Sequence, residues 1–289
     1  MQLEIPLYGL KPKITRKWSH YHSAELRRQN SEDPKGPPKT QKKLFGKIDI
    51  SPYKRPDITT LKDFPIDNVQ GTIYYATISI GSTGQESVVA FGTYFDELVI
   101  PNINCVKCKD KSLYDSSKST TYIANGELID VPCDPFGNFT GFLSLDRIQI
   151  GDIEGVLTFA EAESVPEVLN DYIFDGLWGL GFPHDREASD GAVSTIEQLF
   201  NERKVTYPAF SFFFRRTLDP DSKFQSTLIL GTPNPEYFTG NLEYHPIMGF
   251  DQAHWKVELY AIGGKNEYFL GKAMIAKFDT LEPFISVNS

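Results

Sequence analysis

The sequence predicts an all-β fold, because short alternating segments and regularly spaced turn signals dominate it. Residues 73–80 alternate so that Tyr74, Ala76, Ile78 and Ile80 share one face, as in a strand with one buried side. Turn sequences rich in glycine and polar residues recur about every ten residues, a spacing typical of large all-β proteins. The composition, with 13% aromatic and 23% charged residues, is that of an ordinary globular protein.

Other segments have the composition of strands, and one has the signature of a helix start. The strands are expected at residues 86–91, 97–100, 141–150, 156–160, 209–215 and 226–230. A capping box at residues 194–197, Ser-Thr-Ile-Glu, predicts the start of a helix that continues to Lys204. Ile196, Leu199 and Phe200 would form its apolar stripe.

The charge is distributed unevenly along the chain. Residues 1–64 contain 14 Lys and Arg against 7 Asp and Glu, a net charge of +7. Since the whole chain has 29 basic and 38 acidic residues, the remaining 225 residues hold 15 basic and 31 acidic ones, a net charge of −16. An acidic body would repel phosphate, so we expect no nucleic-acid partner and a basic arm that folds onto the acidic body.

Membrane spans and targeting signals are not expected from the sequence. No run approaches the roughly 18 apolar residues of a membrane-spanning helix. The first residues, Met-Gln-Leu-Glu-Ile-Pro, lack the apolar core of a signal peptide, which indicates a cytosolic protein if this N-terminus is complete. The three cysteines cannot all pair with one another.

A set of motifs in a fixed order carries the most specific information. The most distinctive is the block at residues 174–183, Phe-Asp-Gly-Leu-Trp-Gly-Leu-Gly-Phe-Pro. Supporting motifs lie at residues 74–81, 88–91, 98–101, 105–122, 231–233, 237–240 and 255–257. In this order the motifs resemble the pepsin family of aspartic proteases, and the resemblance extends over nearly the whole chain.

The resemblance implies a bilobal pepsin-like fold whose interlobe cleft binds a peptide or protein as an added strand. Residues 1–64 would be a basic prosegment-like arm, 65–207 the N-terminal lobe and 208–289 a partial C-terminal lobe. The chain ends ten residues after Asp279, where family members continue for about a hundred residues, a length typical of a domain. We therefore expect an incomplete second lobe, and the aromatic run at 210–214 is interpreted as a strand between the lobes.

The two active-site loops depart from the family pattern, which reads Asp-Thr-Gly-Ser/Thr at both places. At the first loop, residues 92–95 read Gly-Thr-Tyr-Phe, so Gly92 replaces the first catalytic aspartate. The second loop keeps Asp279, but Leu281 replaces the glycine and a glutamate replaces the Ser/Thr. The resemblance implies that Thr93 and Thr280 hydrogen-bond the two loops together, so a structural clasp is expected without the chemistry.

Further positions are assigned through the same resemblance. Asp134 falls at the flap tyrosine, and Pro135 would stiffen a hairpin that must close over substrate. Cys105 and Cys108 correspond to a small disulfide, although their spacing alone would also suit half of a zinc site or a redox pair. Cys133 is expected to be an unpaired thiol rather than a nucleophile.

The sequence also carries a possible modification site and bears on metal binding. Asn138-Phe139-Thr140 is a glycosylation acceptor if the chain is secreted. The histidines make no metal or triad pattern, so no metal and no cofactor are expected.

Three hypotheses follow. The first is a monomeric, secreted or lysosomal homologue that binds peptides or a partner without catalysis, since Gly92, Tyr94, Leu281, Asp134 and the missing C-terminal part all depart from a working enzyme. The second is an active aspartic endopeptidase working at acid pH, in which Asp279 pairs with Asp96 or Asp134. The third is an incomplete gene model or degenerate copy.

Overall fold

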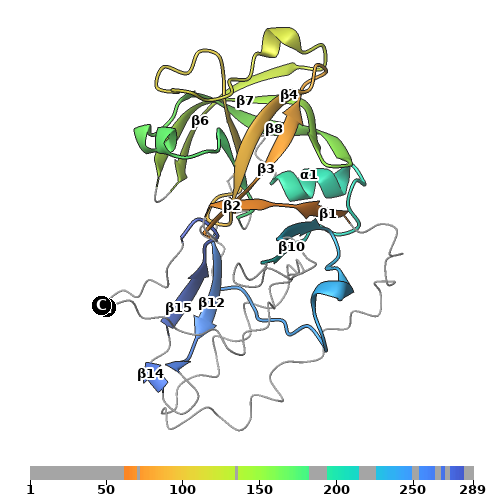
Figure 1. Cartoon of the computed structure of the whole chain (residues 1–289), viewed down its shortest axis with the longest axis vertical. Coiled ribbons are helices and arrows are strands. Elements are labelled where there is room, and N and C mark those ends of the chain that lie inside the picture. The colour runs from red at the N-terminus through yellow and green to blue at the C-terminus, as the bar shows by residue number, and fades with distance from the viewer. Residues whose placement is uncertain are drawn as a thin grey trace.

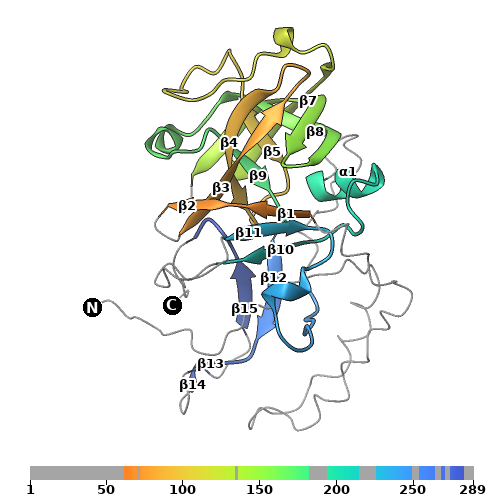
Figure 2. The same cartoon turned by 45° about the vertical axis from the view of Figure 1, so that its right-hand side comes forward.

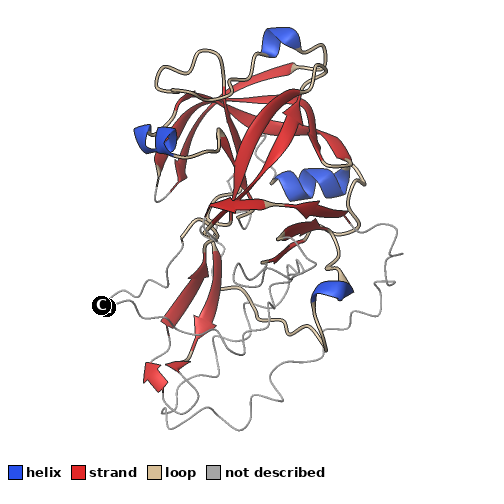
Figure 3. Ribbon diagram, in the orientation of Figure 1, coloured by secondary structure: helices blue, strands red, loops and turns tan. Residues whose placement is uncertain are grey.

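The computed structural model of the chain describes residues 62–69, 72–133, 136–181, 194–214, 226–248, 254–263, 268–270 and 274–282. Strands dominate these residues, and the few helices are short and lie at the edges of the sheets (Figure 3). The prediction of an all-β fold is therefore confirmed. Nearly all of the predicted basic arm lies outside the described residues. Its last three residues, 62–64, belong to a strand that continues to Pro65.

The N-terminal lobe is built on one eight-stranded sheet (Figure 1). Its strands are β2 (Asp67–Val69), β3 (Ile73–Ile80), β4 (Gln85–Gly92), β5 (Leu98–Pro101), β6 (Ile123–Cys133), β7 (Gly137–Ile150), β8 (Ile153–Ser164) and β9 (Gly176–Gly179). They are ordered β2-β3-β4-β9-β5-β8-β7-β6. An additional pairing of β3 with β7 makes the sheet curl back on itself, with Ser79 opposite Gln149.

The motif at residues 174–183 supplies β9, which crosses the middle of this sheet. β9 runs parallel to β4, with Phe91 opposite Trp178, and antiparallel to β5. Two glycines let the chains approach closely: a Cβ at Gly179 would lie 2.5 Å from the backbone oxygen of Glu97, and one at Gly176 would lie 2.3 Å from that of Val99. Only glycine fits such contacts, which gives the motif its physical meaning.

A three-stranded sheet lies beneath the N-terminal lobe in Figure 2 and has the order β1-β11-β10. Its strands are β1 (Lys62–Pro65), β10 (Phe210–Phe213) and β11 (Thr227–Leu230). The aromatic run at 210–214 packs upward into the first lobe, since Phe212 lies 6.4 Å from Phe91 between ring centroids and Phe214 lies 4.4 Å from Tyr74. The run is therefore a packed strand.

The remaining described strands form two small antiparallel pairs. One pair is β12 (Trp255–Leu259) with β15 (Met274–Phe278), and the other is β13 (Ile262–Gly263) with β14 (Tyr268–Leu270). The start of β12 and the end of β15 lie close to the first lobe in Figures 1 and 2, which brings the residues after β15 up to the loop that follows β4. The exposed side chains of this pair include Ile275 at 58% and Phe278 at 41%.

The single α-helix among the described residues, α1 (Thr195–Asn201), begins where the capping box predicts. The Ser194 hydroxyl accepts a hydrogen bond from the Glu197 N–H, and Ile196 and Leu199 are buried against the first-lobe core. Phe200 is 40% exposed and does not belong to the buried stripe. The helix ends at Asn201, short of Lys204, so the predicted stripe and length were too long by about one turn. Short 3-10 helices lie at Ser116–Lys118, Glu167–Asp171 and Pro235–Tyr237.

Candidate functional site

The candidate site is the junction of two loops that are distant in sequence. The first loop follows β4 and begins at Gly92, the last residue of that strand. The second follows β15 and begins at Asp279, one residue after the strand ends. Strand β4 lies inside the eight-stranded sheet, whereas β15 has one paired neighbour among the described residues. The first loop therefore follows a strand that is paired on both sides, whereas the second follows a strand of a two-stranded sheet.

Two threonines join the loops through reciprocal hydrogen bonds. The Thr93 hydroxyl donates to the backbone oxygen of Phe278 at 2.8 Å and accepts from the Thr280 N–H at 3.1 Å. The Thr280 hydroxyl donates to the backbone oxygen of Phe91 at 2.6 Å. Each hydroxyl thus donates to a backbone oxygen next to the other loop. Thr93 binds Phe278, the residue before Asp279, and Thr280 binds Phe91, the residue before Gly92. This arrangement is a clasp between the lobes, and we refer to the pair as the threonine clasp.

Backbone hydrogen bonds hold the first loop against β9 and the residues after it. The Leu180 N–H donates to the Gly92 oxygen, and the Gly181 N–H donates to the Phe95 oxygen, at 2.7 and 2.6 Å. The Trp255 indole N–H then donates to the Leu180 oxygen at 2.7 Å, which ties β12 to the same segment. The first loop is consequently held by the first lobe and by the second-lobe strand together.

The space beside Gly92 is filled by two apolar side chains. A Cβ built on Gly92 would lie 2.6 Å from the Phe95 ring and 2.8 Å from the Leu281 side chain. Both neighbours are core residues: Phe95 is 3% exposed and Leu281 is 2% exposed, within one apolar cluster. Leu281 comes from the second loop, so this cluster crosses the junction. A carboxylate side chain at residue 92 would have to displace one or both.

Asp279 lies in the second loop and is partly buried. Its Oδ1 accepts the N–H of Leu281 at 2.9 Å, the local turn contact common for aspartates. Asp96, one of the two residues that could supply a second carboxylate for Asp279, is 3% exposed. It lines a small cavity with Glu97, Thr158 and Thr195. Asp279 is not among the residues that line this cavity. Asp134 lies outside the described residues.

Tyr94, in the first loop, makes contacts that could not be predicted from the sequence. Its ring lies 3.9 Å from the imidazole of His254 between centroids, and its backbone oxygen lies 3.0 Å from His254 Nδ1. The Lys277 ammonium lies 5.9 Å from the centre of the same ring, within range of a cation–π contact. His254 directly precedes the matched motif at 255–257, the only sequence signal that could have drawn attention to it.

Asp175 occupies a buried position beneath the first loop and serves the backbone. Its Oδ2 accepts the Val88 N–H at 2.8 Å and its Oδ1 accepts the Ser112 N–H at 2.9 Å. Both carboxylate oxygens are used, and the side chain is 5% exposed. Asp175 therefore holds β4 and a neighbouring loop together, and it has a structural role.

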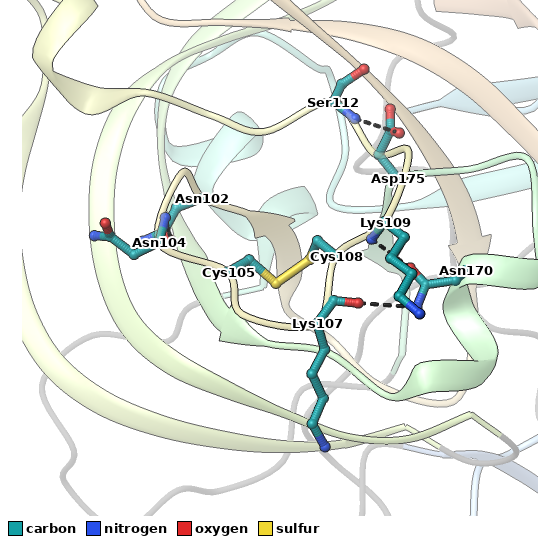
Figure 4. The surroundings of a disulfide bond; sticks show 9 residues. All are labelled: Asn102, Asn104, Cys105, Lys107, Cys108, Lys109, Ser112, Asn170 and Asp175. Atoms are coloured by element: carbon teal, nitrogen blue, oxygen red, sulfur yellow. Dashed lines mark hydrogen bonds between the residues drawn. A yellow bond between two sulfur atoms is a disulfide. The ribbon is translucent and has the colours of Figure 1, made fainter.

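The other residues singled out from the sequence lie away from the loop junction. Cys105 and Cys108 form a disulfide, whose surroundings are drawn in Figure 4. Cys133 keeps its thiol and is buried at 1% exposure. Asn138 and Thr140 are both exposed on β7, so the glycosylation triplet is accessible in the folded chain.

The described residues contain neither a cluster of metal ligands nor a membrane-spanning helix. Among the described residues no group of three or more His, Cys, Asp or Glu could hold a metal ion. Within the same part of the chain no helix is long and apolar enough to cross a membrane.

Comparisons with known proteins agree with the resemblance seen in the motifs. The family model for eukaryotic aspartyl proteases matches residues 73–280. Similar curated proteins include renin from Echis ocellatus, 30% identical over 76% of this chain and 56% of the relative, and cathepsin D from Clupea harengus, 32% identical over 67% and 49%. Vacuolar protease A from Neurospora crassa is 32% identical over 69% of this chain and 49% of the relative. The chain spans about half the length of these relatives.

Proposed function

The chain belongs to the eukaryotic aspartyl protease family, and from that premise we propose that it is a non-catalytic member, one that binds an extended peptide or a partner protein. The reaction of the family requires two carboxylates that share one proton, one acting as base on a water and the other as acid. Asp279 supplies one carboxylate at the loop junction, and Gly92 stands at the other position. One carboxylate cannot fill both roles.

The filled space beside Gly92 is the observation that carries this proposal. The side chains of Phe95 and Leu281 occupy the volume that a side chain at residue 92 would enter. Protein interiors are packed as densely as organic crystals, so such a space does not reopen at low cost. The proposal therefore predicts that a single Gly92→Asp change does not create a protease.

The threonine clasp supports a role for the fold without the chemistry. Thr93 and Thr280 make three hydrogen bonds between the loops, two of them through the hydroxyl of Thr93. These contacts align the lobes whether or not the carboxylates are present. A chain that keeps its lobes aligned keeps the frame in which an added peptide strand can bind.

The proposal extends to the state and location of the protein. We place it as a monomer in a secretory or lysosomal compartment, because its relatives include a vacuolar protease and because a disulfide forms between Cys105 and Cys108 in oxidising surroundings. An accessible Asn138 is consistent with the same route. An active acid endopeptidase is the competing function, and it needs a second carboxylate beside Asp279.

The test uses the purified full chain, its Asp279→Ala variant and a control in which the exposed Asp130 on β6 is changed to alanine. Each is incubated at acid pH with an unfolded protein substrate, and a statine-type peptide is titrated in parallel. We expect no cleavage by any of the three and saturable binding of the peptide. Cleavage by the chain and by the Asp130 variant, lost only in Asp279→Ala, would show that the protein is a protease.

A further inference from the structure

The Cys105–Cys108 disulfide closes a much shorter loop than a disulfide that stabilises a fold usually does. The two cysteines are separated by only two residues, Val106 and Lys107. A disulfide stabilises a fold mainly by restricting the unfolded chain, and the restriction grows with the number of residues in the closed loop. This disulfide closes a four-residue loop, so the first lobe depends little on it for stability.

The loop is held in place by contacts that do not pass through the sulfur–sulfur bond. Asn170 receives the Lys109 N–H on its Oδ1 at 2.9 Å and donates from its Nδ2 to the Lys107 oxygen at 3.0 Å. Figure 4 shows Asn170 beside the disulfide, joined to the residues on both sides of Cys108. The Cys105 and Val106 N–H groups donate to the backbone oxygens of Asn102 and Glu163.

A second set of contacts fixes the end of the loop. The Lys111 ammonium donates to the backbone oxygens of Tyr172 and Phe174 at 2.6 and 2.8 Å, and Ser112 is bound by Asp175. The frame on both sides of the cysteines is therefore independent of the disulfide. Two thiols held on such a frame remain near each other, and a nearby thiol pair re-forms its disulfide readily.

The surroundings also favour a reactive sulfur. Both cysteines are partly exposed, and Val106 between them is 88% exposed. The Lys111 ammonium is bound by backbone oxygens and faces Asp110, Asp171 and Asp175, so the positive charge next to Cys108 comes from the exposed Lys107 and Lys109. Positive charge stabilises a thiolate, which is both the attacking and the leaving form of a thiol. The same charge would attract an anionic thiol to this face of the lobe.

We propose that Cys105 and Cys108 form a reversible dithiol–disulfide site that exchanges with an anionic low-molecular-weight thiol of the glutathione type. The thiolate of the first molecule attacks one sulfur, and the sulfur–sulfur bond breaks to leave a mixed disulfide and one cysteine thiolate. A second small-molecule thiolate then attacks the small-molecule sulfur of the mixed disulfide, and the bond to the cysteine sulfur breaks to release the second cysteine as a thiolate. The chain gains two electrons and two protons as a dithiol, and the two small thiols leave as their own disulfide. This site is independent of the proposed peptide binding.

The experiment equilibrates the folded full chain in buffers of reduced and oxidised glutathione, traps free thiols by rapid alkylation and maps them by mass spectrometry. We expect Cys105 and Cys108 to be alkylated together in reducing buffer and protected again after return to oxidised glutathione. The buried Cys133 is the internal reference and should react only in denaturant. Circular dichroism should report a folded chain in both states.

A matched pair of variants tests whether the hydrogen bonds of Asn170 hold the two cysteines near each other. Asn170→Ala removes two hydrogen bonds that hold the cysteines near each other, so the ratio of dithiol to disulfide should rise on the order of tenfold. Asn104→Ala, an exposed asparagine in the same loop, should leave the ratio unchanged. A disulfide that resists glutathione until the chain unfolds would overturn the proposal, as would equal ratios in the two variants.

Discussion

The two loops at the junction differ in what supports them. In the first loop, Thr93, Phe95, Asp96 and Glu97 are all less than 9% exposed, and backbone hydrogen bonds bind the loop to the residues of β9 and beyond. The second loop follows a two-stranded sheet with exposed apolar side chains, and Leu281 is its buried member. The second loop therefore takes its position from the first. The difference teaches that the buried contacts at this site are those that attach one lobe to the other.

Removing the buried side chain of the second loop should have the largest effect. Leu281→Ala takes apolar volume out of a cluster where the residue is 2% exposed, so we expect a loss of about 3 kcal/mol in the free energy of unfolding. Chemical denaturation measures it. Ile275→Ala, from the exposed face of β15, is the control and should change stability by less than about 0.5 kcal/mol. Equal losses would contradict the view that Leu281 anchors the second loop.

Adding a side chain to the first loop should have the next largest effect. Gly92→Ala places a Cβ within 2.6 Å of Phe95 and 2.8 Å of Leu281, so overpacking should cost about 2 kcal/mol. Thermal unfolding followed by circular dichroism measures the loss. A variant as stable as the parent chain would show that the space beside Gly92 is open.

The two halves of the threonine clasp should not contribute equally. Thr93→Val removes a hydroxyl that donates to Phe278 and accepts from Thr280, and should cost about 2 kcal/mol. Thr280→Val removes the hydrogen bond from the hydroxyl to the Phe91 oxygen and should cost about 1 kcal/mol. Equilibrium unfolding in urea compares the two, with Thr→Ser at each position as the control that keeps the hydroxyl. The reverse order of losses would contradict the asymmetry.

Asp279 should have the smallest effect of all. Asp279→Ala removes the acceptor for the Leu281 N–H in a partly exposed turn, so the loss should be about 0.5 kcal/mol. The same denaturation experiment measures it, and Asp279→Asn, which keeps an acceptor oxygen, is the control. A loss above about 2 kcal/mol would show that this carboxylate is an important structural contact at the junction.

Much of the framework could be predicted because its signals are local or motif-based. Alternation predicted β3, the capping box predicted the start of α1, and the ordered motifs predicted the family. Strand β6 was not predicted, because most of its side chains are exposed and it has no regular apolar alternation. Strands β12 and β15 were likewise missed, since their pairing spans residues far apart in the chain.

The sequence singled out residues of both loops, but it could not predict how they pack. Comparison of motifs identified Gly92, Thr93 and Thr280, since each stands at a fixed place in a short pattern. The contact of Leu281 with the space beside Gly92, and that of His254 with Tyr94, join segments more than 150 residues apart. Side-chain packing over such distances follows no periodicity in the sequence. The three-dimensional structure was therefore needed to show what fills the junction.

A double-mutant cycle between Gly92→Ala and Leu281→Ala tests the central claim most directly. If Leu281 fills the place of a side chain at residue 92, removing it should relieve part of the overpacking. We predict that Gly92→Ala costs about 1 kcal/mol less in the Leu281→Ala background than in the parent chain, a coupling typical of residues in contact. Additive losses, with no coupling between the two changes, would contradict the claim.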